Sequence, residues 1–195
     1  ASVCTDCSPG SYQEAVGQPN CNDCVSGKVT YTAGQSTCSD CPTGKISSLV
    51  GGSTCIDCPA GTYQDSTGQT SCFDCDKGKY QGQLGQNKCI NCEPGRYAKE
   101  KQQAQCDSCI AGKYAPEGYS FCPPCPQGKY AAAAQSGFCT DCEIGKYDDT
   151  LISPSSEDPG ATSCQPCGLG TFASYPGKTD CTECPVNSFQ DEIVL

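Results

Sequence analysis

The residues best suited to chemistry in this sequence are its 22 cysteines, all of which fall in C-x-x-C pairs. Thiolates of this kind ligate zinc, take part in thiol–disulfide exchange, or form structural disulfides. Successive pairs are 17 residues apart in eight of the ten intervals, so one chemistry recurs along the chain. The first members of the eleven pairs are Cys4, Cys21, Cys38, Cys55, Cys72, Cys89, Cys106, Cys122, Cys139, Cys164 and Cys181.

Structural disulfides explain these pairs better than zinc or redox catalysis. Zinc ribbons separate two C-x-x-C groups by about 15–20 residues, whereas the usual gap here is 13 residues and the sequence contains no His. A thioredoxin-like site needs a single C-x-x-C at the start of a helix, with a tuned thiolate pKa. We therefore expect disulfides, no metal and no other cofactor.

Composition supports a disulfide scaffold. Leu, Ile, Val and Phe together number 24 of 195 residues, and the formal net charge is −10. Such a chain has too little apolar surface to offset its conformational entropy and would normally be disordered. The 22 cysteines replace the missing core with covalent links. Because disulfides persist in oxidising compartments, we expect an extracellular protein, either secreted or a cell-surface ectodomain.

Several functional classes are excluded by what the sequence lacks. No apolar run approaches the ~18 residues of a membrane span, so we expect none in this segment. The acidic balance argues against nucleic acid, whose phosphates need clustered Lys and Arg. Without His the usual proton shuttle at neutral pH is missing, and we expect the protein not to be an enzyme.

The residues between the cysteines repeat as well. Gly stands three residues after the second Cys in ten units, and Asn187 stands there in the eleventh, which predicts a turn with positive φ. A bulky residue follows two positions later, and it is Tyr or Phe in nine units. A second Gly precedes most of the next pairs by four residues. We therefore predict a small disulfide-rich fold, an elongated solenoid-like rod of ~17-residue repeats with short β-hairpins and turns and almost no helix.

This pattern resembles the ephrin-receptor-like cysteine-rich repeat, a relative of the tumour-necrosis-factor-receptor module. The clearest copies are Cys58-Pro-Ala-Gly-Thr-Tyr63 and Cys125-Pro-Gln-Gly-Lys-Tyr130. The resemblance covers essentially the whole chain. Such repeats occur in receptors, secreted matrix proteins and protist surface proteins, so the resemblance implies an extracellular module without identifying a ligand.

Three disulfide connectivities remain open from the residues alone: within each C-x-x-C, crossed between two neighbouring pairs, or from the second Cys of one pair to the first Cys of the next. Resemblance to the simplest tumour-necrosis-factor-receptor module implies the last, which we call the ladder. A 15-residue disulfide loop contributes roughly 3 kcal/mol in the chain-entropy model. The ladder would join Cys7–Cys21, Cys24–Cys38, Cys41–Cys55, Cys58–Cys72, Cys75–Cys89, Cys92–Cys106, Cys109–Cys122, Cys125–Cys139, Cys142–Cys164 and Cys167–Cys181.

Charged residues also follow the repeat. An acidic column of residues precedes the second Cys in six units (Asp6, Asp23, Asp40, Asp57, Asp74 and Asp141), with Asn91, Ser108 and Glu183 as variants. Ca²⁺ ligation is one interpretation, but turn capping suits these residue types better. Lys or Arg precedes the bulky residue in seven units, and would pair weakly with a neighbouring acid. The aromatic rings are expected to cover disulfides or the next unit.

We expect residues 1–195 to form a single array of eleven units, interrupted by an insert at 148–159. The insert is rich in Ser, Pro and acidic residues, and its hydroxyls are candidate O-glycan sites: Thr150, Ser153, Ser155 and Ser156. A tolerated surface loop is an equally good interpretation. A protein ligand, if there is one, should contact this insert, because binding sites commonly lie on loops that break a regular scaffold.

The near-uniform repeats favour a structural role, as a rod, spacer or filament element of a cell surface, matrix or fibre. The alternative is a ligand-binding ectodomain segment of a cell-surface receptor. Under the ladder, Cys4 and Cys184 lack partners, so we expect the chain to be a fragment of a longer one. Its partners would then be further repeats or copies of itself joined end to end.

Overall fold

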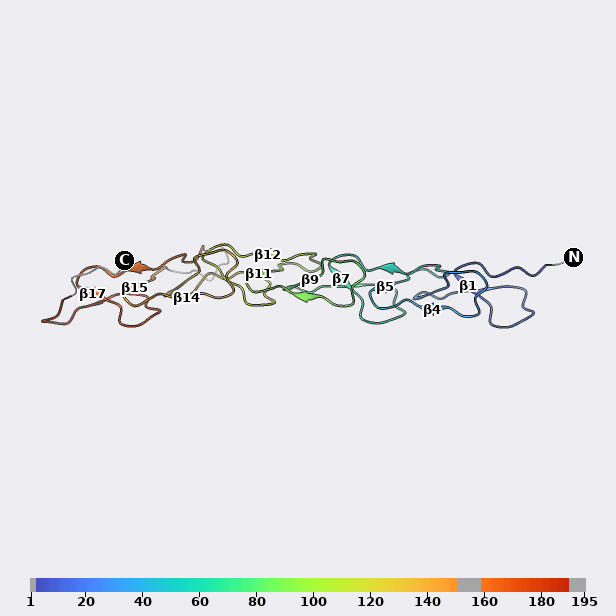
Figure 1. Cartoon of the computed structure of the whole chain (residues 1–195), viewed down its shortest axis with the longest axis horizontal. Coiled ribbons are helices and arrows are strands. Elements are labelled where there is room, and N and C mark those ends of the chain that lie inside the picture. The colour runs from blue at the N-terminus through green and yellow to red at the C-terminus, as the bar shows by residue number, and fades with distance from the viewer. Residues whose placement is uncertain (1–2, 151–158, 190–195) are drawn as a thin grey trace. The chain divides into compact units, whose positions relative to one another are not determined.

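The computed structural model describes residues 3–150 and 159–189. Over these residues the chain has eighteen strands of two residues each and no helix. The ribbon in Figure 1 accordingly contains short arrows, such as the one at β5, and no coiled segment. Strands of this length are not stable alone, so the fold depends on links between repeats. The predicted short hairpins and the lack of helix are confirmed for the described part of the chain.

The strands pair into nine antiparallel hairpins. These pair β1 (Ser11–Tyr12) with β2 (Asn22–Asp23), β3 (Lys28–Val29) with β4 (Ser39–Asp40), β5 (Lys45–Ile46) with β6 (Ile56–Asp57), β7 (Thr62–Tyr63) with β8 (Phe73–Asp74), β9 (Lys79–Tyr80) with β10 (Ile90–Asn91), β11 (Arg96–Tyr97) with β12 (Asp107–Ser108), β13 (Lys129–Tyr130) with β14 (Thr140–Asp141), β15 (Lys146–Tyr147) with β16 (Gln165–Pro166) and β17 (Thr171–Phe172) with β18 (Thr182–Glu183).

Each hairpin joins two consecutive repeats. Its first strand follows the turn glycine of one repeat, and its second strand lies between the two cysteines of the next. In the β5–β6 hairpin, for example, Lys45 is opposite Asp57 and Ile46 is opposite Ile56. The register therefore places the cationic position of one repeat across from the acidic position of the following repeat.

One hairpin is reduced, where the interval between pairs is a residue short. Lys113 and Pro124 form only an isolated antiparallel bridge, and Tyr114 forms a parallel bridge with Ser136. The two bonded cysteines here are 13 positions apart in the sequence instead of the usual 14. The missing residue thus shortens the hairpin while the surrounding repeats keep their register.

The turn positions have the predicted left-handed backbone. The turn residue has positive φ in all eleven repeats, from Gly10 at 90° to Asn187 at 68°. Where the second glycine is replaced, Gln102 and Gln135 adopt positive φ as well, at 65° and 61°. The repeat geometry therefore requires this conformation even where the side chain disfavours it.

The contacts divide the chain into two compact units. Unit 1 contains Ala1–Asp76, Tyr80–Ile90 and Lys101–Gln105, and unit 2 contains Lys77–Lys79, Asn91–Glu100 and Cys106–Leu195. Within each unit the buried residues are cysteines and small or polar side chains, with Val29 the one large aliphatic residue among the buried side chains described. No helix in the described ranges is long and apolar enough to cross a membrane.

Candidate functional site: the disulfide ladder and the contacts between repeats

Ten disulfides link the repeats in the ladder connectivity. Each joins the second Cys of one repeat to the first Cys of the next, with Cα–Cα distances of 5.6–5.8 Å. The second Cys is buried in all ten bonds, whereas most of its partners are half-buried or exposed. The two cysteines are 14 positions apart in the sequence in eight bonds, and 22 positions apart at Cys142–Cys164, where the insert lies.

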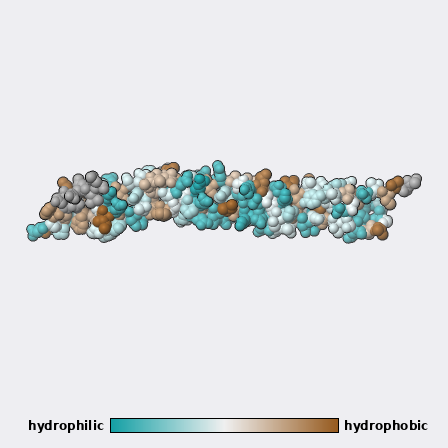
Figure 2. Space-filling view, viewed as in Figure 1, coloured by the Kyte–Doolittle hydropathy of each residue, from teal (hydrophilic) through white to brown (hydrophobic). Residues whose placement is uncertain are grey.

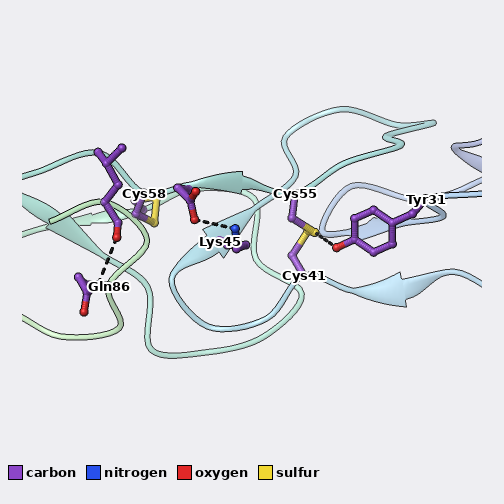
Figure 3. Close-up of polar contacts among 9 residues, drawn as sticks. Tyr31, Cys41, Lys45, Cys55, Cys58 and Gln86 are labelled. Carbon is purple, nitrogen blue, oxygen red and sulfur yellow. Dashed lines mark hydrogen bonds and ion pairs between the residues drawn. A yellow bond between two sulfur atoms is a disulfide. The ribbon is translucent and has the colours of Figure 1, made fainter.

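The Cys41–Cys55 bond shows what surrounds one disulfide of the ladder (Figure 3). The hydroxyl of Tyr31 donates a hydrogen bond to the Sγ atom of Cys55 at 3.3 Å, from a repeat two positions earlier in the chain. Elsewhere, Tyr97 packs on the cluster formed by Cys109, Ala115 and Cys122. Tyr97 thus covers a disulfide, as expected for the aromatic column.

Cys4 and Cys184 are free thiols in this structure. Cys4 is exposed, and Cys184 is half-buried. All the other cysteines are in the ladder.

Backbone hydrogen bonds connect each repeat to the next. The amide of Gly27 donates to the carbonyl oxygen of Ser47 at 2.7 Å, and the amide of Gly51 donates back to the carbonyl oxygen of Cys24 at 2.7 Å. The turn glycine makes the first of these bonds in nine repeats. The donors are Gly10, Gly27, Gly44, Gly61, Gly78, Gly95, Gly112, Gly128 and Gly145.

The turn glycine also contacts the repeat after the next. A β-carbon built on Gly27 would collide with the carbonyl oxygen of Gly68. Gly44 meets Gly85 in the same way, and Gly61 meets the carbonyl of Gln102. Glycine is therefore needed here for two separate reasons, its positive φ and the close approach of another backbone.

Sequence reasoning missed the most buried side-chain column apart from that of the second Cys. It lies directly after the bulky residue, whereas the bulky residues themselves are mostly half-buried. The available signal was the lack of Lys, Arg and Glu at this position, and not hydrophobicity. The described buried members are Thr30, Ser47, Gln64, Gln81, Ala98, Ala115, Ala131, Asp148 and Ala173.

Glutamines in this column hold their own repeat together. The Gln64 side chain is 1% exposed; its Nε2 donates to the carbonyl oxygen of Ser71 at 2.8 Å, and its Oε1 accepts from the amide of Ser66 at 3.0 Å. Gln13 and Gln81 form the same two bonds in their repeats. A buried amide is thus satisfied by bridging the two ends of a loop.

The acidic column forms ion pairs across the hairpins. Nζ of Lys45 lies 2.8 Å from Oδ1 of Asp57 (drawn in Figure 3), and the pairs Lys28–Asp40 and Lys129–Asp141 are equivalent. These side chains are 40–50% exposed, so each pair is worth about 0–1 kcal/mol. Separately, a hydrogen bond to Asp76 raises the pKa of Lys101.

The acidic side chains also face the second glycine of the following repeat. Oδ1 of Asp57 lies beside Gly85, and Oδ1 of Asp141 beside Gly177. Where glutamine replaces glycine, Nε2 of Gln102 donates to Oδ1 of Asp74 at 3.0 Å. Within residues 3–150 and 159–189, no three His, Cys, Asp or Glu side chains gather closely enough to hold a metal ion.

The insert is described only at its ends. The hydroxyl of Thr150 donates to Oδ1 of Asp148 at 2.5 Å, and the Thr150 amide donates to the same oxygen at 3.2 Å. Asp148 is 4% exposed, and its Oδ2 has no hydrogen-bond partner among the described residues. The other candidate O-glycan residues, Ser153, Ser155 and Ser156, lie outside the described residues.

A ladder of short disulfide loops, with glycine turns in place of an apolar core, defines an extracellular cysteine-rich repeat array. The family model described as "Tyrosine-protein kinase ephrin type A/B receptor-like" matches residues 1–41, 44–85, 112–158 and 157–194. These matches cover most of the chain, so the chain belongs to the ephrin type A/B receptor-like family. A comparison with curated proteins found no match.

Family membership confirms the resemblance drawn from the sequence. The matched family is a receptor ectodomain repeat and is not catalytic. Together with the ten disulfides, it indicates an extracellular or cell-surface protein of receptor-ectodomain type.

Proposed function

We propose that this chain is a structural element of the extracellular space, a spacer or filament segment in which the number of repeats determines the reach. The observation that carries the proposal is the repetition of one backbone contact, from the turn glycine to the next repeat, in nine repeats. Solenoid repeats contact mainly their neighbours, so repeats add length without changing the rest.

Deletion of whole repeats tests this proposal. Removing residues 38–71 excises two repeats and leaves Cys24 at its usual spacing from Cys72, so the ladder can close again. Removing residues 72–105 instead is the matched control, with the same number of residues lost from a different region. A spacer predicts that both deletions keep native disulfides and reduce the maximum dimension in small-angle X-ray scattering by the same amount. Unequal reductions, or misfolding of either variant, would contradict it.

The second candidate is a ligand-binding segment of a receptor ectodomain, which the family match favours. The insert at 148–159 breaks the repeat and places Cys142 and Cys164 22 positions apart in the sequence, which makes it the expected contact region. Deleting residues 149–158 should abolish capture of an extracellular ligand while leaving the remaining disulfides intact. A ligand that binds equally well after the deletion would move the site elsewhere.

The proposed extracellular function includes two covalent modifications of the chain, disulfides at its two free thiols and O-linked glycans. Cys4 and Cys184 would form disulfides with other repeats or with a second copy end to end, because a free exposed thiol is unusual in an oxidising compartment. Thr150, Ser153, Ser155 and Ser156 would carry O-linked glycans. Mass measurement of protein secreted from eukaryotic cells, before and after O-glycosidase treatment, tests the second of these.

A further inference from the structure

A shallow hollow recurs at the same place in the repeat. It is bounded by the bulky residue of one repeat, the cysteine bend and cationic position of the next, and the first Cys of the one after. The first hollow, about 290 Å³, is lined by Tyr12, Glu14, Asp23, Val25, Lys28, Thr37 and Cys38. Equivalent hollows of about 240 and 150 Å³ lie beside Tyr97 and Tyr130. The repeat therefore presents one concave site several times, with different side chains.

The hollow beside Tyr97 has the opposite charge from the one beside Tyr12. Lys99 stands where the first hollow has Glu14, and Ser108 stands where it has Asp23. All three hollows also have a lysine at the cationic position of the repeat, which is Lys113 in the hollow beside Tyr97. Differences at two equivalent positions thus make the hollow beside Tyr97 cationic, whereas the hollow beside Tyr12 is acidic.

Arg96 does not line the hollow, but it extends the cationic surface beside it. It lies directly across the β11–β12 hairpin from Ser108. In the hairpins with Lys28, Lys45 and Lys129, the residue in that place is an aspartate that forms an ion pair. Serine cannot neutralise Arg96, and neither Arg96 nor Lys99 forms an ion pair with any residue that the structure describes.

The acidic group nearest in register is Asp107, which lies opposite Tyr97 in the same hairpin and has an interaction of its own. Lys113 is 9% exposed and also has a partner, so it forms part of the wall of the hollow. The cations available to a ligand are accordingly Arg96 and Lys99.

The charge difference extends over the surrounding sequence. Seven of the twelve Lys and Arg residues, but only four of the 22 Asp and Glu residues, fall within residues 77–122. This segment has a net charge of +3, while the rest of the chain has −13. Because the Debye length is about 8 Å at physiological ionic strength, an anion at the Tyr97 hollow is largely screened from the acidic regions beyond.

Apolar side chains complete the hollow. Tyr97, Ile110 and Phe121 line it, and Phe121 is 50% exposed, with its ring centroid 6.3 Å from that of Tyr119. Exposed apolar side chains also gather around another hollow, lined by Leu49, Val50 and Ile56, but the lining of that hollow contains no Lys or Arg. On the face shown in Figure 2 the other hydrophobic residues appear as separate brown spots. Beside Tyr97 the apolar side chains lie next to cations, so the site offers flat apolar rings together with groups that bind sulfate or carboxylate.

We propose that the hollow lined by Tyr97, Lys99 and Phe121 binds a sulfated polysaccharide. A sugar ring has an apolar face for the aromatic side chains, and its sulfates at the ring edge would contact Lys99 and Arg96. An acidic peptide would use the cations but has no equivalent flat face for the rings. The extracellular setting of the family supplies such polysaccharides, and the inference holds whether the chain acts as a spacer or as a receptor segment.

The test is binding of a heparin-derived octasaccharide to the intact chain by surface plasmon resonance, at several salt concentrations. We expect the double variant Arg96→Ala/Lys99→Ala to weaken binding at least tenfold, and to reduce the slope of log K against log salt by about two, one for each lost contact. The matched control is Lys28→Ala/Lys146→Ala, which removes the same charge from the equivalent hollows.

A transplant provides the converse experiment. Ser11→Arg, Glu14→Lys and Asp23→Ser give the first hollow the charges found at and beside the Tyr97 hollow, and Thr37→Phe adds the ring. In the Arg96→Ala/Lys99→Ala background these four changes should restore binding severalfold. Failure of the native chain to bind, or equal losses in the control and test variants, would overturn the proposal. Equally tight binding of polyglutamate, or of phosphatidylserine vesicles, would assign the hollow to acidic peptides or membranes and would also overturn it.

Discussion

The carbonyl oxygen of Gly68 occupies the space that a β-carbon on Gly27 would need, although the two residues are separated by more than two repeats. This contact explains why the repeats stack so closely without large side chains. It also separates two roles of the turn glycine, because Gly170 occupies the same repeat position with φ 79°, and no atom of the described residues lies within 4 Å of its would-be β-carbon.

Gly27→Ala should therefore be much more destabilising than Gly170→Ala. Both variants carry the strain of positive φ, which costs about 1–2 kcal/mol, but only Gly27→Ala forces two backbones apart, at a further cost of about 1–3 kcal/mol. Thermal unfolding with the disulfides intact measures the difference, and hydrogen exchange locates it. Equal losses in the two variants would show that the contact with Gly68 carries no energy.

Buried glutamine gives a second comparison. Gln64→Leu should destabilise its repeat by about 1–3 kcal/mol, because the Ser66 amide and the Ser71 carbonyl lose their partner in a part-buried site. Gln13→Leu removes the same two bonds at a half-buried position, where water replaces them. Denaturant unfolding should show the larger loss for Gln64→Leu. The reverse order would mean that the side-chain bridge is unimportant.

The sequence predicted those features of the fold that restrict the type of residue at a position. It did not predict those that depend on how the backbones of different repeats stack. The glycine turns were recognisable because positive φ restricts the choice of residue, as Asn187 shows. The burial of Gln64 was not, since Gln is a polar residue and its neighbour Tyr63 was the residue expected to pack on a disulfide or on the next unit. Contacts such as Gly27 with Gly68 depend on the rotation between repeats, which no single repeat encodes.

The ion pairs across the hairpins should matter little. Lys45→Met should change the free energy of unfolding by less than about 1 kcal/mol, because the Lys45 and Asp57 side chains are 40% and 44% exposed. Lys129→Met tests the equivalent ion pair, Lys129–Asp141, in the other compact unit. Salt titration of the melting temperature checks the electrostatic origin. A loss above 2 kcal/mol would indicate that packing of the lysine stem is the larger contribution.

The ladder itself should be indispensable. Dithiothreitol should abolish protection of backbone amides and make the chain protease-sensitive, since Leu, Ile, Val and Phe amount to only 24 of 195 residues. EDTA serves as the control and should leave the circular dichroism unchanged. Unfolding by EDTA with resistance to reductant would mean that a metal holds the cysteines.

The two free thiols lead to the last prediction, which concerns covalent association between chains. When the chain is secreted under oxidising conditions, its copies should form disulfides between Cys4 and Cys184. A non-reducing mass measurement should then show species whose masses are multiples of the single-chain mass. Reduction should collapse the series to one 20.3 kDa species. Because Cys4 is exposed and Cys184 only half-buried, both thiols are accessible to a partner without disturbing the ladder. Cys4→Ser and Cys184→Ser should each limit the series to dimers, and the double variant should be monomeric. A monomeric native chain in which both thiols react with iodoacetamide would exclude this bond. Multimers that persist in the double variant would show that the copies are linked through ladder cysteines that have exchanged partners.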